Sequence, residues 1–223
     1  MKVCVIIPTY NEARAIGSVV SAIRREGLEA VVVDDGSCDN TVSLARDSGA
    51  IVLKNPANQG KGASLVKGFK YALERDFTAV ITMDGDGQHL PEDIPSLMGS
   101  ASRSPAGIII GNRMLKTGAM PWPRILTNRF MSWLVSLIVK QQIPDSQCGF
   151  RLIRRELLGR LNLLTTKYET ETEILIRAAQ MGFAIESVAI NTVYGEEKSQ
   201  INSFLDTARF IRFMMREIWT MPF

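Results

Sequence analysis

Short runs of β-branched residues alternate, in the first half of the chain, with segments whose apolar residues recur every three or four positions. The runs cover residues 3–7, 30–33, 50–53, 79–83 and 107–111. The intervening segments predict helices that follow Asn11, follow Ser37 or Asp39, and extend from about Gly62 to Arg75. Strands that are apolar on both faces and joined by helices imply a mainly parallel sheet covered on both sides. We therefore expect an α/β fold.

The second half of the chain has a less regular pattern. It predicts helices over residues 122–140 and 168–182, a loop over 143–151, a strand near 184–193 and a last helix from Ser203. Internal repeats and linker-like tracts are absent from the sequence. We expect one domain over residues 1–200, followed by an amphipathic C-terminal helix over 201–223.

Composition narrows the class of protein. Among 223 residues, 46% are hydrophobic, enough for a substantial core, and 26 basic residues against 23 acidic ones give no reason to expect a nucleic-acid partner. Three cysteines without a CxxC pair suggest neither a disulfide framework nor a zinc site, which fits a reducing cytoplasm. The apolar run near the N-terminus is too short for a signal peptide, and residues 130–139 fall short of the roughly 20 needed to span a bilayer.

Three polar clusters follow predicted strands: "PTYNE" at residues 8–12, "DDGS" at 34–37 and "DGDGQ" at 84–88. In sheets of this type, ligands bind beyond the carboxyl ends of the strands, so the clusters should converge on one crevice. Asp84 and Asp86 would repel each other unless a cation lies between them. A turn would also account for this Asp-Gly sequence. The functional interpretation is that both carboxylates, with Gln88, hold Mg²⁺ or Mn²⁺, and that the ion also binds a diphosphate.

The aspartates of "VVVDDGS" also have two interpretations. Asp34 or Asp35 could cap the next helix, or could accept a hydrogen bond from a base N–H or a ribose hydroxyl. The dinucleotide glycine pattern is missing from the first loop, and "NQGKGAS" at residues 58–64 lacks the spacing of a Walker loop. These absences disfavour an ordinary dehydrogenase or kinase.

Five motifs occur in a fixed order: "PTYNE", "VDDGSCDNT", "NQGKGAS", "MDGDGQH" and "DSQCGFR". Together they make residues 3–200 resemble the inverting glycosyltransferases of the GT-A (nucleotide-diphospho-sugar transferase) fold, closest to their polyprenyl-phosphate, dolichol-phosphate mannosyltransferase-like branch. The resemblance implies an enzyme that takes a hexose from a UDP- or GDP-sugar, uses Mg²⁺ or Mn²⁺, inverts the anomeric carbon and has polyprenyl phosphate as acceptor.

The resemblance also implies roles for individual residues. Contacts to the nucleotide sugar fall on Pro8, Tyr10, Glu12, Asp35, Lys61 and Asp84. The metal ion would be bound by Asp84, Asp86 and Gln88. The acceptor phosphate would be bound by Arg113, Arg124, Asn128 and Lys198. The catalytic residues would be Asp86, Arg113 and Asp145. The segment around Lys198 differs from the pattern of the branch, in which the serine comes before the lysine, because here Lys198 precedes Ser199. Lys198 could instead form an ordinary surface ion pair with the neighbouring glutamates.

The residues leave the acceptor open. An alcohol acceptor needs a general base, whereas a phosphate monoester is already an anion and needs cations around it. Arg124 and Asn128 lie one turn apart on the predicted helix 122–140, although an ordinary amphipathic helix would also place them there. Asp145 either orients a sugar hydroxyl or acts as base toward an alcohol such as a saccharide. A binding module without catalysis is a third reading, against which Asp84 and Asp86 argue.

Two further segments have alternative readings. The glutamates Glu169, Glu171 and Glu173 are further potential bases. They alternate by two, so they cannot share one face of a helix, and a negatively charged helix start also accounts for them. The last predicted helix has an apolar arc of Phe204, Ala208, Ile211, Met215 and Ile218, with Phe210 and Phe213 outside it. This helix either packs on the core or lies in a membrane interface. A lipid acceptor would favour peripheral association with the inner face of the membrane.

Overall fold

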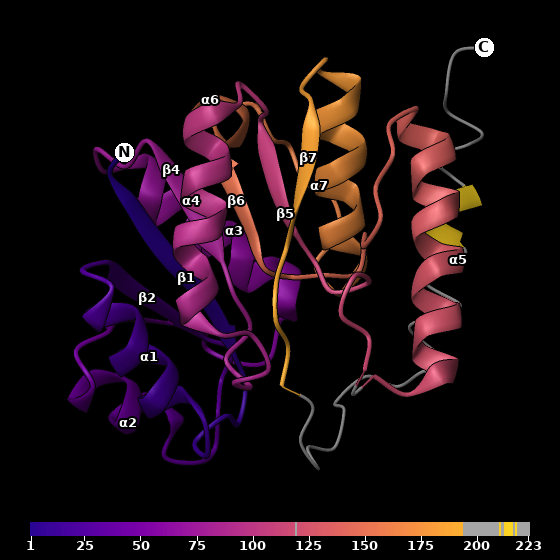
Figure 1. The fold of residues 1–223 in the computed structure, drawn as a ribbon. Helices are drawn as coiled ribbons and strands as arrows, with labels where there is room; N and C mark the ends of the chain where they lie inside the picture. Colours follow the sequence, from indigo (N-terminus) through magenta and orange to yellow (C-terminus); the bar gives the residue numbers. More distant parts are fainter. Residues whose placement is uncertain (119, 194–209, 211, 216, 218–223) are drawn as a thin grey trace.

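The structure, a computed structural model, describes residues 1–118, 120–193, 210, 212–215 and 217 (Figure 1). Seven strands form one sheet in the order β3-β2-β1-β4-β6-β5-β7. The strands are β1 (Val3–Thr9), β2 (Glu29–Asp34), β3 (Ile51–Lys54), β4 (Ala79–Thr82), β5 (Ile108–Asn112), β6 (Arg151–Arg154) and β7 (Ile185–Ala189). Within this sheet only β6 runs antiparallel to its neighbours, β4 and β5. The prediction of a mainly parallel α/β sheet is confirmed.

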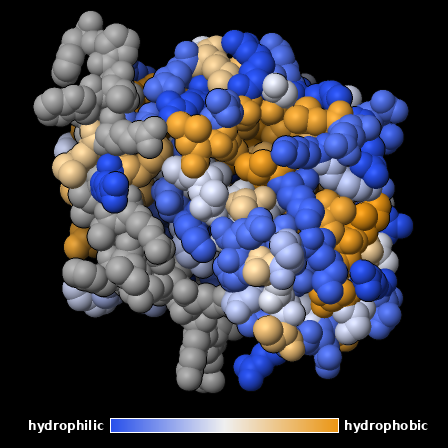
Figure 2. Space-filling view, turned by 180° about the vertical axis from the view of Figure 1, so that it is seen from behind, coloured by the Kyte–Doolittle hydropathy of each residue, from blue (hydrophilic) through white to orange (hydrophobic). Residues whose placement is uncertain are grey.

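Helices cover both faces of the sheet (Figure 1). The helices are α1 (Ile16–Arg25), α2 (Thr41–Asp47), α3 (Lys61–Leu73), α4 (Ile94–Arg103), α5 (Trp122–Val139), α6 (Arg155–Leu158), α7 (Glu169–Gln180) and the 3₁₀ turn η1 (Pro91–Asp93). One layer contains α1, α2 and α4, and the opposite layer contains α3 and α7, with α5 packed outside α7. Seen from behind (Figure 2), hydrophilic side chains make up most of the coloured surface.

The chain reaches α1 differently from the expectation. Asn11 is not the cap of this helix: it has a φ of 57°, and α1 begins at Ile16. The Asn11 backbone N–H donates to the Ser37 hydroxyl, and its side-chain oxygen accepts from the backbone N–H of Cys38. Asn11 therefore ties the loop after β1 to the loop after β2. A short polar residue is one of the few besides glycine that adopts a positive φ readily.

Strand β6 begins at Arg151, the last residue of the loop expected over residues 143–151, and no strand was predicted at residues 151–154. The sequence of β6, "RLIR", contains only two apolar residues. Arg151 is 1% exposed, and its guanidinium donates to backbone carbonyls of Ser146 and Cys148. Those hydrogen bonds offset the cost of burying a charge, which a hydropathy pattern does not reveal.

Helix α5 has apolar residues on its exposed side as well as on the side that it packs against the core. Its inward face contains Asn128 and Ser132 together with Val135 and Val139. Three further apolar residues, Met131, Leu134 and Ile138, are partly buried against the core. Five other large apolar residues are each more than half exposed: Trp122, Leu126, Phe130, Trp133 and Leu137. We call these five residues the outer face of α5. A soluble helix normally buries such a stripe, so this face needs an explanation outside the core.

The predicted C-terminal helix is described only at residues 210, 212–215 and 217, which are helical where assigned. Phe210, Phe213 and Met214 are buried in the main core, whereas Met215 is 62% exposed. The predicted apolar arc, which included Met215 and left out the two phenylalanines, is wrong at these positions. Lys198 and Ser203 lie outside the described residues, and the division into residues 1–200 and 201–223 stays a prediction. No helix in the described part of the chain is both long and apolar enough to cross a bilayer.

Candidate active site

The first and third polar clusters meet at the carboxyl end of the parallel strands. Gly85, between the two aspartates, packs so tightly that a Cβ there would lie 2.5 Å from Cγ2 of Thr9 and 3.6 Å from Cγ of Glu12. The Asp35 backbone N–H donates to the Thr9 carbonyl at 2.8 Å, which joins the second cluster to the first. The expected convergence of the three clusters on one region is therefore seen in the structure.

Asp84 lies next to a cation supplied by the chain itself. The Lys61 Nζ lies 2.5 Å from Oδ1 of Asp84 and 3.1 Å from Oε1 of Glu171. Burial alone would raise the pKa of Asp84, but Lys61 and, more weakly, His89 and Arg113 lower it to about 2. Burial would likewise lower the pKa of Lys61, and the two carboxylates raise it instead. Asp84 and Lys61 are therefore both ionised at neutral pH.

The glycines of "NQGKGAS" bring Lys61 to this position. A Cβ on Gly60 would lie 2.5 Å from the Thr166 carbonyl oxygen, and one on Gly62 would lie 2.0 Å from Oγ1 of Thr170. The N-terminus of α3 can therefore approach the loop before α7 only without side chains at these two positions. Gly60 also has a φ of 102°, which strains other residues. This close approach places Lys61 within reach of both Asp84 and Glu171.

Asp86 is oriented by a local turn. Its Oδ1 accepts from the backbone N–H of Gln88 at 2.9 Å, a hydrogen bond typical of aspartates in turns. Across the described residues, no set of three His, Cys, Asp or Glu side chains is grouped closely enough to hold an ion by itself. Two neighbouring carboxylates still fit Mg²⁺ or Mn²⁺, because these ions are commonly held by one or two carboxylates with phosphate and water completing the shell. Gln88 is half-buried beside them.

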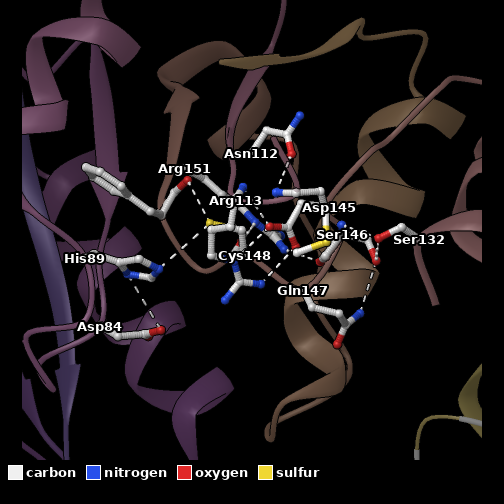
Figure 3. A network of polar contacts seen from close by, with 12 residues as sticks. Asp84, His89, Asn112, Arg113, Ser132, Asp145, Ser146, Gln147, Cys148 and Arg151 are labelled. Carbon is white, nitrogen blue, oxygen red and sulfur yellow. Dashed lines mark hydrogen bonds and ion pairs between the residues drawn. The ribbon is translucent and has the colours of Figure 1, made fainter. Parts of the chain in front are cut away.

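His89 is buried beside Asp84 (Figure 3). Its Nδ1 lies 3.9 Å from Oδ2 of Asp84, its Nε2 lies 3.8 Å from Sγ of Cys148, and its ring stacks on Phe150 with centroids 5.4 Å apart. Burial lowers the pKa of His89 to about 4, although the Asp84 charge opposes this. Burial also raises the pKa of Cys148 to about 12. Both side chains are neutral at pH 7, so Cys148 is not a reactive thiolate.

Arg113 and Asp145 form a buried bidentate ion pair (Figure 3). Arg113 donates from Nε to Oδ2 and from Nη2 to Oδ1 of Asp145, both at 2.8 Å, and its backbone N–H donates to Oδ2 at 3.1 Å. The two side chains are 6% and 0% exposed. Strand β5 ends just before Arg113, so the pair ties that strand end to the loop over residues 143–150. Two residues predicted to be catalytic are thus brought together, with Asp145 accepting from Arg113.

The second cluster assigns different roles to its two aspartates. Asp35, predicted to contact the nucleoside, accepts from Asn55 Nδ2 at 2.8 Å and from the backbone N–H groups of Gln59 and Gly60 at 3.0 and 2.7 Å. Its carboxylate therefore organises the loop that precedes Lys61. Asp34 accepts from the backbone N–H of Ser37, while its Oδ2 is buried without a partner among the described residues.

The candidates for the acceptor lie on α5 and beside it. Asn128 is 7% exposed, and its Nδ2 finds no hydrogen-bond partner in the described part of the chain. One turn later, the Ser132 hydroxyl accepts from the backbone N–H of Ser146 at 2.8 Å and contacts the Ser146 hydroxyl (Figure 3). Arg124 is exposed near the start of the same helix. Asn128 is therefore buried on the side of α5 from which Ser132 contacts the loop, whereas Arg124 lies at the surface.

The remaining predicted donor contacts come from β1 and the turn after it. Pro8 is buried within β1 opposite Val33, and Tyr10 is half-buried just beyond the end of the strand. Glu12 is half-buried, and its backbone N–H donates to the Thr41 hydroxyl. Tyr10 and Glu12 thus lie at the carboxyl end of the sheet, where donor contacts were expected.

Glu171 was considered only as a potential base, and its contact with Lys61 was not predicted. The sequence groups it with Glu169 and Glu173, and alternation by two predicted that they could not share a face. The structure separates them: Glu171 contacts Lys61, whereas Glu173 is buried and accepts from the backbone N–H groups of Leu164 and Thr165. No local signal distinguished Glu171, because its partner lies 110 positions earlier in the chain.

Comparison with known proteins identifies the family. A model described as "Glycosyl transferase family 2" matches residues 4–161, more than half of this chain. The chain belongs to this family. An undecaprenyl-phosphate mannosyltransferase of Micrococcus luteus is 32% identical over 211 residues, which cover 88% of this chain and 85% of that protein. A UDP-N-acetylglucosamine–dolichyl-phosphate N-acetylglucosaminyltransferase of Methanococcus voltae is 29% identical, with coverage of 86% and 85%.

A solved structure agrees with the observed architecture. Glucosyl-3-phosphoglycerate synthase of Mycobacterium tuberculosis, solved with Mn²⁺, UDP and glucosyl-3-phosphoglycerate, superposes with a TM-score of 0.75. The match covers 98% of this chain and 79% of that one at 20% identity. The chain therefore has the GT-A fold, as the motif resemblance implied.

Proposed function

We propose that this family 2 enzyme moves a hexose from a nucleotide-diphosphate sugar, UDP- or GDP-linked, onto a polyprenyl phosphate, with inversion at the anomeric carbon and with Mg²⁺ or Mn²⁺ bound. Glycosyl transfer follows from family membership. The acceptor class is supported by relatives named for transfer to undecaprenyl phosphate and dolichyl phosphate. The donor class and the metal are supported by the Mycobacterium tuberculosis structure with UDP and Mn²⁺.

The main support for a phosphate acceptor is the buried ion pair that Asp145 forms with Arg113. An alcohol acceptor needs a base that can take its proton, and Asp145 was the sequence candidate for that role. In the structure its carboxylate is fully buried, and both oxygens accept from Arg113. A buried carboxylate whose two oxygens both accept from a guanidinium is poorly placed to take a proton from an acceptor hydroxyl. A phosphate acceptor avoids this problem because it reaches the site already ionised.

The proposed step then needs no proton transfer. An oxygen of the acceptor phosphate attacks the anomeric carbon, and the bond from that carbon to the donor diphosphate breaks. The electron pair leaves with the nucleoside diphosphate, and the new bond forms on the opposite face of the sugar. A divalent ion held by Asp84 and Asp86 would neutralise the negative charge that develops on the leaving diphosphate.

Residues of this chain would do the binding and positioning around that step. Lys61 lies beside Asp84 and can reach a diphosphate bound there. Glu12 and Asp35 are the proposed nucleoside side, with Asp35 acting through the loop that it holds. Asp145 fixes the guanidinium of Arg113, so that a cation is already positioned at the end of β5 before substrate binds.

Asn128 supports an anionic ligand on the acceptor side. An amide N–H₂ group that is buried without a partner costs roughly 1–3 kcal/mol of stability. Such a group is commonly retained where a ligand completes the hydrogen bond. Asn128 lies one turn before Ser132, whose hydroxyl accepts from the loop that contains Asp145. Arg124 stays a candidate at the exposed start of α5, and Lys198, outside the described residues, stays a prediction.

The outer face of α5 supports contact with a lipid surface. The five apolar residues on this face lie on the helix that also contains Asn128. The helix has no acidic residue, and Arg124 and Arg129 are exposed beside the apolar stripe. Apolar and aromatic side chains flanked by cations are typical of helices that lie in the interface of an anionic membrane. This arrangement would bring a lipid-linked phosphate to the inward side of α5.

The test is transfer of radiolabel from a panel of UDP- and GDP-hexoses to undecaprenyl phosphate in detergent, with Mn²⁺, Mg²⁺ or chelator. Metal-dependent label in the lipid phase is the expected result, and it also identifies the donor. Label released only as free sugar would contradict the lipid acceptor and direct attention to saccharide acceptors, for which loss of Asp145 should abolish transfer but spare donor hydrolysis. Absence of any donor turnover would instead indicate a binding module.

A further inference from the structure

Two carboxylates from distant parts of the chain share one ammonium group. Asp84 follows β4, Glu171 lies in the first turn of α7, and the Lys61 Nζ is 2.5 Å from the first and 3.1 Å from the second. The three side chains are only 17%, 28% and 12% exposed for Lys61, Asp84 and Glu171. The cation is thus held between two anions in a partly dry environment, where such contacts are stronger than at the surface.

The backbone brings the two carboxylates together at Gly149. A Cβ on this glycine would lie 2.8 Å from Oε1 of Glu171 and 3.0 Å from Oδ2 of Asp84. Any side chain at this position would therefore displace one carboxylate or the other. Arg151 donates to the backbone carbonyl of Glu171 and to those of Ser146 and Cys148, which fixes the start of α7 against this loop. Glu171 is thereby positioned by a rigid, buried support.

We propose that Glu171 is a positioning residue for the metal site. Its carboxylate holds the Lys61 ammonium group when a divalent ion takes the place of that group on Asp84. This inference rests on the metal-binding part of the proposed function. The ammonium group and the ion both need the carboxylate of Asp84, and like charges close together repel. Lys61 must therefore move off Asp84 as the ion binds. Glu171 is already within 3.1 Å, so the lysine can shift its contact without becoming an unpaired buried charge.

Without Glu171, Lys61 would have Asp84 as its remaining carboxylate partner in this triad and would compete more strongly with the ion. Without Lys61, that competition would disappear, and Asp84 and Asp86 would attract the ion with only their own repulsion opposing it. The effects of the two residues should therefore be coupled. Coupling of this kind is measured by a double-mutant cycle.

The experiment measures Mn²⁺ alone, without nucleotide or lipid, by electron paramagnetic resonance of free Mn²⁺ during titration of the full chain. We expect Glu171→Gln to weaken Mn²⁺ binding about tenfold and Lys61→Met to strengthen it about tenfold. In the Lys61→Met background, Glu171→Gln should have almost no further effect. Glu169→Gln, which neutralises a glutamate in the same helical turn, is the matched control and should leave Mn²⁺ affinity unchanged.

A second readout uses the metal-free protein. In the presence of chelator, Lys61→Met should lower the melting temperature because Asp84 and Glu171 lose the cation between them. Excess Mn²⁺ should restore the melting temperature. If Lys61→Met fails to fold, Lys61→Gln, which keeps a polar group of similar reach, replaces it in the cycle.

Three outcomes are decisive against the inference. If Glu171→Gln weakens Mn²⁺ equally with and without Lys61, then Glu171 attracts or ligates the ion directly. If Glu171→Gln has no effect on Mn²⁺ in the wild-type background, then Lys61 does not need it. If the wild-type chain binds no Mn²⁺, the metal site itself is overturned, whereas an error in the acceptor assignment leaves every one of these measurements unaffected.

Discussion

Arg113 binds both carboxylate oxygens of Asp145 in a pair that is almost completely withdrawn from solvent. The pair joins the end of β5 to the loop before β6, and a third hydrogen bond comes from the Arg113 backbone. This ion pair changes the interpretation of Asp145, which the sequence suggested as a possible catalytic base. Its visible role is to hold a cation in place, and that role can be tested separately from transfer.

Removal of one partner should therefore damage the fold. Asp145→Ala leaves the Arg113 guanidinium buried without its counter-charge, and we expect the free energy of unfolding to fall by about 3 kcal/mol. Urea denaturation with chelator present measures this change. The double variant Arg113→Met with Asp145→Leu should recover much of the loss because no charge remains buried. Equal stability of Asp145→Ala and wild type would show that the pair contributes little.

The metal assignment predicts loss of binding at Asp86. Asp86→Ala leaves one carboxylate of the pair, so metal-dependent donor affinity should fall by at least about tenfold, measured by calorimetry with UDP and Mn²⁺. Asp47→Ala, which removes an exposed aspartate at the end of α2, is the control and should bind as wild type does. Unchanged metal dependence in Asp86→Ala would remove this residue from the metal site.

Replacing Asn128 by an apolar residue should make the protein more stable but weaken its binding of the acceptor. Asn128→Leu replaces a buried amide whose Nδ2 has no partner among the described residues, so the free energy of unfolding should rise by about 1 kcal/mol. The same change should raise the KM for polyprenyl phosphate about tenfold, because the ligand loses a buried donor. The KM for the nucleotide sugar should stay constant. A stabilised variant with an unchanged acceptor KM would exclude Asn128 from the acceptor site.

His89 should make the metal-free protein sensitive to mild acid. Its pKa is lowered by burial to about 4 from the ordinary value of 6.5, so the unfolded chain takes up a proton first as the pH falls. Stability is therefore complete above pH 6.5 and decreases between pH 6.5 and pH 4. At pH 5 the loss from this group should be about 2 kcal/mol, at 1.36 kcal/mol per unit.

Urea denaturation at pH 7.5 and pH 5, with chelator present, measures this dependence. His89→Leu should lose less stability than wild type between the two pH values, since the titrating group is gone. Asp84, whose pKa is lowered to about 2, contributes its own loss only below its ordinary pKa of 3.8 and does not interfere at pH 5. An identical pH dependence of the two proteins would show that His89 is not the group responsible.

The outer face of α5 should govern binding to membranes. Phe130 and Trp133 are 56% and 55% exposed, so replacing both by glutamate should leave the melting temperature nearly unchanged. Binding to vesicles that contain phosphatidylglycerol, measured by co-sedimentation, should fall at least about tenfold. The control is Leu44→Glu on α2, in the opposite helical layer and 38% exposed, which should bind as wild type. Retained vesicle binding would assign membrane contact to another surface.

The amino-acid sequence by itself determined the elements that depend on local patterns. The five β-branched runs all form strands, because apolar residues on both faces require a sheet buried on both sides. The motif order also identified the family and placed Asp84 and Asp86 directly after a strand. The α5 boundaries differ from the prediction by one residue, since Lys140 ends the helix in a left-handed conformation.

Only the tertiary structure decided which charges face one another. The contacts of Lys61 with Glu171 and of Arg113 with Asp145 join residues 110 and 32 positions apart, and no local pattern encodes such partners. Helix α5 shows the same limit: Asn128 and Ser132 are buried on it together with Val135 and Val139, while five large apolar residues of the same helix are exposed. Periodicity reveals that a helix has two different faces, whereas the neighbouring elements determine which of them is buried.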